Sequence, residues 1–157
     1  MLITIRYITG PSPDLDIIKS LFVEYLNELN ENLCFQSFDN ELEDPLKKYG
    51  PPAGCLLLGY YNNLPAGCIA LQPLSLPGVC EMKRLYVRPA LRKLGIADEL
   101  VRVLLSEAAE KGYKKMVLDT LPKLQAAIKL YSKFGFVNTG AYYDNPLPGV
   151  VYMEKDL

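Results

Sequence analysis

A cationic turn that contains a glycine is the stretch of this sequence best suited to chemistry. It runs through Arg88, Arg92 and Lys93 to Gly95 and Ala97. If a helix starts here, its first turn presents unpaired backbone N–H groups and the positive end of the helix dipole, while the small residues leave room for a bulky anion. The pattern indicates a pyrophosphate-binding turn. A turn in which Gly95 only serves tight packing stays the alternative.

Two common nucleotide-binding loops differ from this turn. A Walker loop requires Gly-Lys-Ser/Thr after four spacer residues, and the dinucleotide fingerprint requires three glycines. Because the turn matches neither pattern, the sequence disfavours an ATP or NAD site.

The sequence contains no histidine. This absence excludes Ser-His-Asp and Cys-His catalysis and removes the commonest transition-metal ligand. Any acid or base must be a carboxylate, a tyrosine, a cysteine or a lysine. The cysteines form no C-x-x-C pair and three of them lie in apolar runs, so we expect structural, reduced thiols and no metal site: Cys34, Cys55, Cys68 and Cys80.

Hydrophobic periodicity places the cationic turn between a strand and a helix. Apolar residues at three- and four-residue spacing predict helices at 15–30, 95–111 and 124–134, with a shorter helix at 39–48 that Pro45 delays or bends. β-Branched and aromatic runs predict strands at 2–8, 54–61, 65–72, 79–87, 114–120, 136–143 and 150–156. This order predicts a mixed α/β fold in a single domain over residues 1–157.

The strand before the turn has an irregular pattern. Its apolar parity changes from Cys80 and Met82 to Leu85 and Val87. Because strand side chains alternate between the two faces, an extra residue is needed to keep these four on one face. The pattern therefore predicts a β-bulge around Lys83–Arg84.

Composition limits the remaining function classes. Half of the 157 residues are hydrophobic and the net charge is -1, an ordinary globular balance that favours neither nucleic acid nor an acidic membrane surface as partner. The N-terminus lacks a basic leader with an apolar run, and no stretch approaches the ~20 apolar residues of a membrane span. We expect a cytoplasmic protein.

The turn and its neighbours resemble the GNAT superfamily of N-acetyltransferases. Arg92-x-x-Gly95-x-Ala97 matches the family's motif A pattern, Gln/Arg-x-x-Gly-x-Gly/Ala. Leu85-Tyr86-Val87-Arg88-Pro89 resembles the motif A strand of the family. Its motif B is similar to Ala127-x-x-Leu130-Tyr131-x-Lys133-x-Gly135-Phe136. The resemblance implies a central mixed, largely antiparallel twisted sheet flanked by about four helices. Two departures are Lys93, where many members carry glycine, and Leu124, where many carry asparagine.

The same resemblance implies how acetyl-CoA would bind as a cosubstrate, without a metal. Main-chain groups of Leu85 and Val87, with Tyr86 between them, would pair with pantetheine as an added strand does. A backbone N–H near Leu85 would polarise the thioester carbonyl. The pyrophosphate would be held by backbone amides of Arg92, Lys93, Leu94, Gly95, Ile96 and Ala97.

The implied reaction is acetyl transfer to a primary amine of a small molecule or peptide, by direct attack in a ternary complex. Glu81 would act as base, directly or through water, because an alkylamine with a pKa near ~10.4 must lose a proton. Tyr131 would protonate the departing thiolate. Structural roles stay open for both residues, as an ion-pair partner of Lys83 or Arg84 for Glu81 and as a core residue for Tyr131.

The acceptor is expected to enter between the N-terminal helices and the C-terminal strands. Candidate contacts there are Tyr25, Glu28, Phe38 and Tyr142, with Glu24, Gln36, Tyr143 and Asp144 nearby in sequence. Acidic and aromatic groups would suit a cationic amine. The amine and the oligomeric state, a homodimer included, stay open. Alternatives are a noncatalytic acyl-CoA sensor or protein-interaction module on the same fold, and a nucleotide-binding module.

Overall fold

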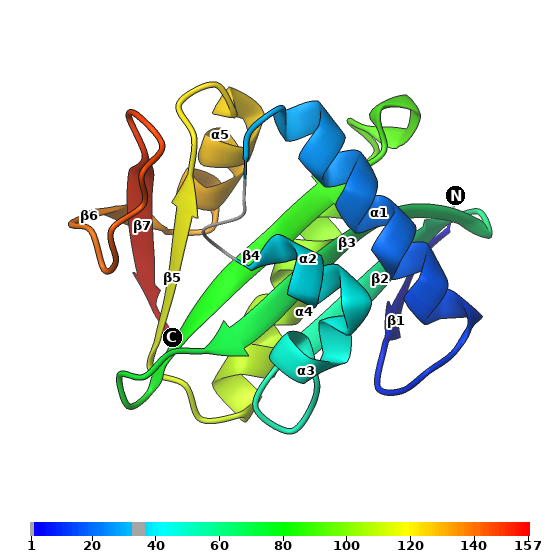
Figure 1. The fold of residues 1–157 in the computed structure, drawn as a ribbon, viewed down its shortest axis with the longest axis horizontal. Coiled ribbons are helices and arrows are strands. Elements are labelled where there is room, and N and C mark those ends of the chain that lie inside the picture. Colours follow the sequence, from blue (N-terminus) through cyan, green and yellow to red (C-terminus); the bar gives the residue numbers. More distant parts are fainter. Residues whose placement is uncertain (1, 33–36) are drawn as a thin grey trace.

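A single seven-stranded sheet organises the part of the chain that the computed structural model describes, residues 2–32 and 37–157 (Figure 1). The strands lie in the order β1-β2-β3-β4-β5-β7-β6, and only β4 and β5 pair in parallel. Cys34 and Gln36 lie outside the described residues. The strands are β1 (Ile3–Tyr7), β2 (Cys55–Tyr61), β3 (Leu64–Pro73), β4 (Val79–Val87), β5 (Lys115–Thr120), β6 (Val137–Thr139) and β7 (Val151–Asp156).

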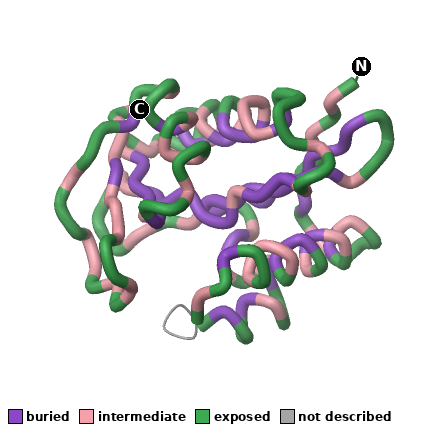
Figure 2. Tube along the Cα trace, turned by 90° about the horizontal axis from the view of Figure 1, so that it is seen from above, coloured by how far each residue is buried: buried purple, intermediate pink, exposed green. Residues whose placement is uncertain are grey.

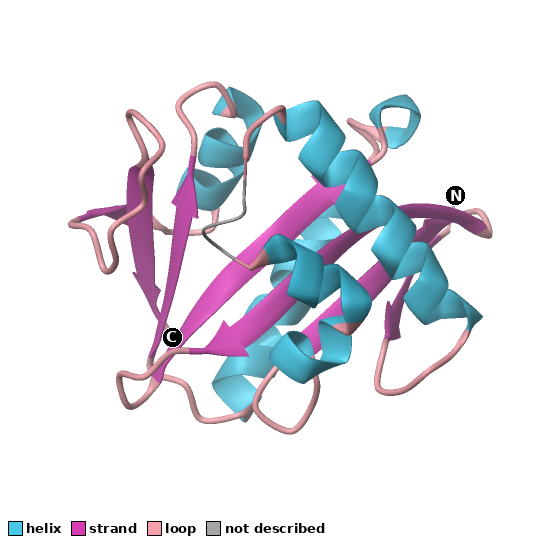
Figure 3. Ribbon diagram, viewed as in Figure 1, coloured by secondary structure: helices cyan, strands magenta, loops and turns pink. Residues whose placement is uncertain are grey.

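Helices cover both faces of the sheet (Figure 3). One face packs against α1 (Pro13–Leu29), α2 (Phe38–Glu43) and α3 (Pro45–Tyr49), and the other against α4 (Ile96–Glu110) and α5 (Gln125–Lys133). Figure 2 shows the buried residues concentrated between these two layers. The predicted fold class is confirmed, with five α-helices in the described residues because Pro45 divides the expected 39–48 helix in two. None of the described helices combines the length and apolar character needed to cross a membrane.

Helix α1 begins and ends where local side chains demand it. The Ser12 hydroxyl accepts a hydrogen bond from the Leu15 amide at 3.3 Å, and Pro13 occupies the first helical turn, where no N–H is needed. Asn30 adopts a left-handed conformation and its amide donates to the Leu26 carbonyl at 3.0 Å. These caps fix the two ends of the helix, which packs against β3 and β4.

The predicted β-bulge in β4 is confirmed. The register with β3 shifts between Cys68 and Ala70, and Arg84 has a φ of 61°, in the left-handed region. As a result Cys80, Met82 and Val87 share one core cluster despite the change in parity. The three buried strand cysteines are free thiols, as expected: Cys55, Cys68 and Cys80.

The strands β4 and β5 pair only at their first residues. Val79, Cys80 and Glu81 lie opposite Lys115–Val117, and no further pair joins the two strands. β5 instead keeps all six residues paired with β7. The two parallel strands therefore separate toward their carboxyl ends (Figure 1), which opens the sheet next to the turn that precedes α4.

One predicted strand is much shorter than expected. The 136–143 run forms only Val137–Thr139, and the chain then leaves the sheet as a loop until β7. Tyr142 and Tyr143 lie in this loop, where their hydroxyls donate to the carboxylates of Glu81 and Asp119. The expectation of a strand through both tyrosines was wrong: strand pairing ends at Thr139, and both hydroxyls donate to carboxylates from the loop.

A buried ion pair joins α2 to the bulge. The Arg84 guanidinium donates from Nε and Nη2 to the two carboxylate oxygens of Glu41 at 2.6 and 2.9 Å, and the Tyr49 hydroxyl donates to the same carboxylate at 2.9 Å. Burial by itself would raise the pKa of Glu41, but the hydrogen bonds and charge of Arg84 outweigh burial and hold that pKa below its usual range. Glu41 is therefore ionised in the folded protein.

The turn before α4 requires two left-handed residues. Gly95 has a φ of 89°, which glycine adopts without steric cost, and Lys93 has a φ of 65°. A non-glycine residue in this region is held at a cost of about 1 kcal/mol. This conformation explains physically why glycine would be the easier residue at position 93.

We expect Glu41→Gln to lower the free energy of unfolding by about 3 kcal/mol at neutral pH, because Arg84 would lose its counter-charge. A carboxyl with a depressed pKa stabilises the fold above its unfolded pKa of about 4.3 and loses that contribution as the pH falls through the folded pKa. The deficit of the variant should therefore shrink in acid. Urea unfolding at several pH values between neutral and acidic measures this loss of stability, with exposed Glu43→Gln as control. A loss that stays constant with pH contradicts the ionised state assigned to Glu41.

We expect Lys93→Gly to stabilise the protein by up to about 1 kcal/mol, since glycine relieves the left-handed strain, although its greater unfolded-state entropy offsets part of the gain. Lys93→Ala, which keeps a Cβ, serves as the matched control and should not stabilise. Chemical unfolding of both variants measures the difference. Equal stability of the two variants would show that backbone strain at position 93 does not affect the stability of the protein.

Candidate active site

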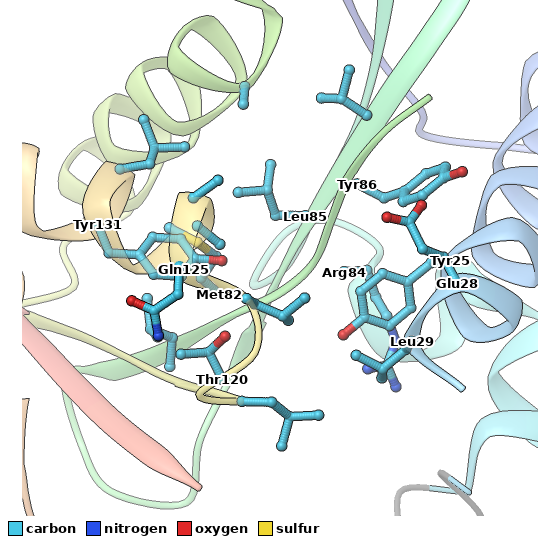
Figure 4. A pocket seen from close by; sticks show the side chains of 18 of the residues that line it. Tyr25, Glu28, Leu29, Met82, Arg84, Leu85, Tyr86, Thr120, Gln125 and Tyr131 are labelled. Atoms are coloured by element: carbon cyan, nitrogen blue, oxygen red, sulfur yellow. The ribbon is translucent and has the colours of Figure 1, made fainter. Parts of the chain in front are cut away.

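A cavity of about 500 Å³ fills the opening between β4 and β5. Its volume is that of a small-molecule or cosubstrate site. Figure 4 shows side chains from α1, β4 and α5 that line it. The wall consists of three residues of α1 (Tyr25, Glu28, Leu29), Met82–Val87 of β4, the turn and start of α4 from Leu91 to Asp98 except Leu94, the segment from Leu118 to Tyr131 with gaps, and Asn145 and Leu147.

The cavity collects eight of the nine residues expected to hold acetyl-CoA. The exception is Leu94, which is 37% exposed and does not line the cavity. The eight are Leu85, Tyr86, Val87, Arg92, Lys93, Gly95, Ile96 and Ala97. Because α4 begins at Ile96, the first amides of this helix lack intrahelical partners and lie at the cavity wall.

Arg92 is committed to contacts within the protein. Its amide donates to the Pro89 carbonyl at 3.4 Å, its Nε donates to the Val87 carbonyl at 2.8 Å, and Nη2 contacts Glu28 at 2.6 Å. The amides available to an anion therefore start at Lys93. The Arg92 side chain fastens the turn to β4 and α1.

The strand edge that faces the cavity follows from the pairing of β4 with β3. The Arg88 amide donates to the Ala66 carbonyl at 2.8 Å, so Arg88 and Tyr86 direct their backbone groups toward β3. Backbone groups alternate along a strand, and those of Leu85 and Val87 therefore face the opening. The Val87 carbonyl is occupied by Arg92, which leaves the Leu85 groups and the Val87 amide at this edge.

Tyr131 lies in the cavity wall and is 7% exposed. Its ring packs edge-on against Phe136 with centroids 5.9 Å apart. Burial, with smaller contributions from Tyr25 and Asp119, raises the pKa of the Tyr131 phenol well above its usual value, so it stays protonated and can donate. Figure 4 shows Tyr131 and Tyr25 projecting into the cavity from opposite walls.

Glu81 is 3% exposed and lies outside the cavity lining. Its carboxylate accepts hydrogen bonds from Gln72 Nε2 at 2.6 Å and from the Tyr142 hydroxyl. The structure thus brings two of the expected site residues, Glu81 and Tyr142, into hydrogen-bond contact, but neither of them lines the cavity. Burial and the charge of Glu81 raise the pKa of Tyr142 well above its usual value, which keeps this phenol a donor.

The expected acceptor contacts divide into two groups. Tyr25 and Glu28 line the cavity, whereas Phe38 does not and packs its buried ring 5.1 Å from the Arg84 guanidinium. The carboxylates of α1 are already paired with the cationic turn, Glu24 with Arg88 and Glu28 with Arg92. The acidic entrance expected for a cationic amine is therefore neutralised.

Charged residues that sequence reasoning did not select line the same cavity. They are Lys83, Arg84, Asp98, Asp119 and Lys123, with the amide of Asn145. The Asp119 carboxylate accepts from Asn145 Nδ2 at 2.8 Å and from the Tyr143 hydroxyl, and lies 4.0 Å from Lys83 Nζ. The sequence did contain a signal for Asp119, because this carboxylate lies near the carboxyl end of the predicted strand 114–120.

Comparison with known proteins agrees with this architecture. A family model described as the acetyltransferase (GNAT) family matches residues 18–136. An uncharacterized N-acetyltransferase of Schizosaccharomyces pombe is 48% identical over 145 residues, which cover 92% of this chain and 89% of the relative.

Two solved structures extend the comparison. An acetyltransferase from Streptococcus agalactiae superposes with a TM-score of 0.80 at 17% identity, over 99% of this chain and 98% of that one. A GNAT family acetyltransferase from Elizabethkingia anophelis, with acetyl-CoA bound, gives a TM-score of 0.67 at 25% identity, again over 99% and 98%. The chain belongs to the GNAT family of N-acetyltransferases.

Proposed function

We propose that the protein transfers an acetyl group from acetyl-CoA to a primary amine of a small molecule or peptide, by direct attack in a ternary complex. The observation that carries this proposal is a single cavity that joins the backbone amides before α4 to the protonated phenol of Tyr131. The Elizabethkingia anophelis relative with acetyl-CoA bound supports the choice of acyl donor.

The cavity suits acetyl-CoA, which supplies the activated acetyl thioester. At one end, the amides from Lys93 to Ala97 and the Lys93 side chain would hold the pyrophosphate. Along the middle, the backbone edge at Leu85 and Val87 would hold pantetheine as an added strand. The amide and strand-edge contacts come from the backbone, so the departures at positions 93 and 124 would leave them intact, and Lys93 would add a side-chain contact.

Tyr131 and the bulge would act on the acetyl group from opposite sides. The Tyr131 phenol holds a proton at the cavity wall, which it would deliver to the thiolate as the C–S bond breaks. A backbone N–H at Leu85, left unpaired by the separation of β4 from β5, would donate to the carbonyl oxygen as the C–N bond forms. Neither role requires a metal or a covalent enzyme intermediate.

Glu81 would receive the proton of the acceptor amine indirectly. Its carboxylate does not line the cavity, and the Tyr142 hydroxyl already donates to it. Tyr142 does not line the cavity either, so a proton would have to reach this carboxylate through intervening water. Since an alkylamine is mostly protonated at neutral pH, such a relay would raise the fraction of attacking amine.

Tyr131→Phe should lower kcat about 10²-fold or more, because the leaving thiolate loses its proton donor. Acetyl-CoA affinity should stay unchanged, since the ring and its packing on Phe136 remain. Free-thiol release with a working amine measures the first quantity and titration calorimetry the second. Tyr113→Phe, which removes a hydroxyl bonded to the Ala53 carbonyl, is the matched control. An unchanged kcat would exclude Tyr131 as the acid.

Glu81→Gln should reduce kcat/KM about 10²-fold near neutrality if this carboxylate receives the proton. The loss should diminish as the pH approaches the pKa of the amine, because a growing fraction of the amine is already neutral. A pH series of initial rates, with exposed Glu43→Gln as control, distinguishes the roles. The same loss at every pH would assign Glu81 a structural role only.

A further inference from the structure

A lysine connects two walls of the cavity. Lys123 Nζ donates to the Leu29 carbonyl at 2.6 Å and contacts the Glu31 carboxylate at 3.2 Å. The Leu29 carbonyl belongs to the last turn of α1, where carbonyls lack intrahelical partners and favour a cation. Leu29 and Lys123 both line the cavity. Figure 4 shows Leu29 and Gln125, which closely follows Lys123 in the chain, on opposite sides of it. This contact, the Lys123 link, therefore crosses the cavity.

The Lys123 link starts from the helix that covers one face of the sheet. The proposed pyrophosphate site lies at the start of α4, which packs on the other face (Figure 3). With acetyl-CoA in place along β4, the α4 side of the cavity is occupied. In a ternary complex the acceptor amine must therefore reach the thioester from the α1 side, past the Lys123 link.

The cavity is apolar next to this link. Leu29 and Leu121 are buried members of the apolar cluster around α1, and Leu124 and Leu147 pack against that cluster. All four leucines line the cavity. Because moving apolar surface out of water is favourable, this side of the cavity suits an acceptor with an apolar body.

The carboxylates of the cavity lining are paired with cations of the protein. Among the described lining residues, each acidic side chain lies within 4.0 Å of a basic one. The pairs are Glu28 with Arg92, Asp98 with Lys133 and Asp119 with Lys83. An acceptor with a second ammonium would bury that charge without a carboxylate to compensate it, which is unfavourable. An acceptor with one amine, which is neutral when it attacks, avoids this penalty.

The volume of the cavity limits the size of the acceptor. A cavity of about 500 Å³ lies within the range of roughly 300–1,000 Å³ that is typical of a site for one small molecule. In a ternary complex the same cavity would hold the pantetheine arm together with the acceptor. A peptide or protein acceptor would therefore have to extend out of the cavity through the space that the Lys123 link crosses.

We propose that the acceptor is a small monoamine with an apolar body, and that Lys123 limits its size. The inference rests on the proposed acetyl transfer and narrows its acceptor class. Lys123 is a specificity-determining residue and takes no part in the transfer itself. Its contact with α1 holds the two walls together, so that a short apolar amine fits inside the link and a peptide chain does not pass it.

Two pairs of acceptors test this assignment by free-thiol release with acetyl-CoA. Hexylamine and hexamethylenediamine have the same carbon chain and differ by one ammonium, and the wild type should give a kcat/KM about tenfold or more higher for hexylamine. Leucinamide and leucyl-glycyl-glycinamide present the same α-amine and differ in length. The wild type should favour leucinamide, again by about tenfold or more.

Variants of Lys123 test its part in the size limit. Lys123→Ala should raise the kcat/KM of the tripeptide amide relative to leucinamide about fivefold, because the two walls lose their contact. This ratio cancels any change in acetyl-CoA binding. Lys123→Arg keeps a cation that can donate to Leu29 and should retain the wild-type ratio. Lys129→Ala, which removes an exposed lysine of α5, is the matched control, and thermal unfolding verifies the fold of each variant.

The outcomes separate this inference from the proposed transfer. A tripeptide amide acetylated as efficiently as leucinamide by the wild type, or a ratio that Lys123→Ala leaves unchanged, overturns the size limit. Equal or better use of the diamine overturns the monoamine assignment. Both results leave acetyl transfer intact. Thiol release above background with no acceptor, despite measurable acetyl-CoA binding, overturns the transfer and the assignment together. If Lys123→Ala does not fold, the wild-type ratios still decide the acceptor class.

Discussion

The ion pair between Arg84 and Glu41 is the interaction on which the site depends most. A guanidinium buried in a protein requires a counter-charge and filled hydrogen bonds, and Glu41 provides both from α2. The pair holds a left-handed residue in the middle of β4 and ties the short helices α2 and α3 to the sheet. The bulge that results decides which backbone groups and which side chains of β4 face the cavity.

The opening of the sheet follows from the divergence of β4 and β5. On one edge β5 pairs along its whole length with β7, but on the other edge it pairs with only three residues of β4, so a wedge remains between two parallel strands. Side chains and backbone edges, instead of strand pairing, line this wedge. The loop after β6 closes one side, because Tyr142 and Tyr143 bond to buried carboxylates of β4 and β5.

The two ends of the cavity have different physical origins. The end proposed to bind the cofactor is made mostly of backbone, from helix amides and a strand edge. The rest of the cavity is lined by side chains from several elements, among them Tyr25, Lys83 and Asp119.

The sequence by itself determined the order of elements, the bulge and the cofactor turn. Period-2 and period-3.6 patterns, the parity change around Lys83–Arg84 and the spacing of Arg92, Gly95 and Ala97 are local properties, written within a few residues. Nearly all of the fold could be predicted for that reason, and so could the turn before α4, whose part in cofactor binding stays a proposal. Pro45 likewise indicated an irregularity in the 39–48 helix, which the structure resolves as two helices, α2 and α3.

Only the tertiary structure decided which charges meet. Glu28 pairs with Arg92 and Glu41 with Arg84, over separations of 64 and 43 residues, so no local pattern could report them. No local pattern could report the hydrogen bond between Tyr142 and Glu81 outside the cavity lining. The same is true of the contact between Asp119 and Lys83 in the cavity. Packing brings such groups within a few ångströms, and their charges depend on that distance and on burial.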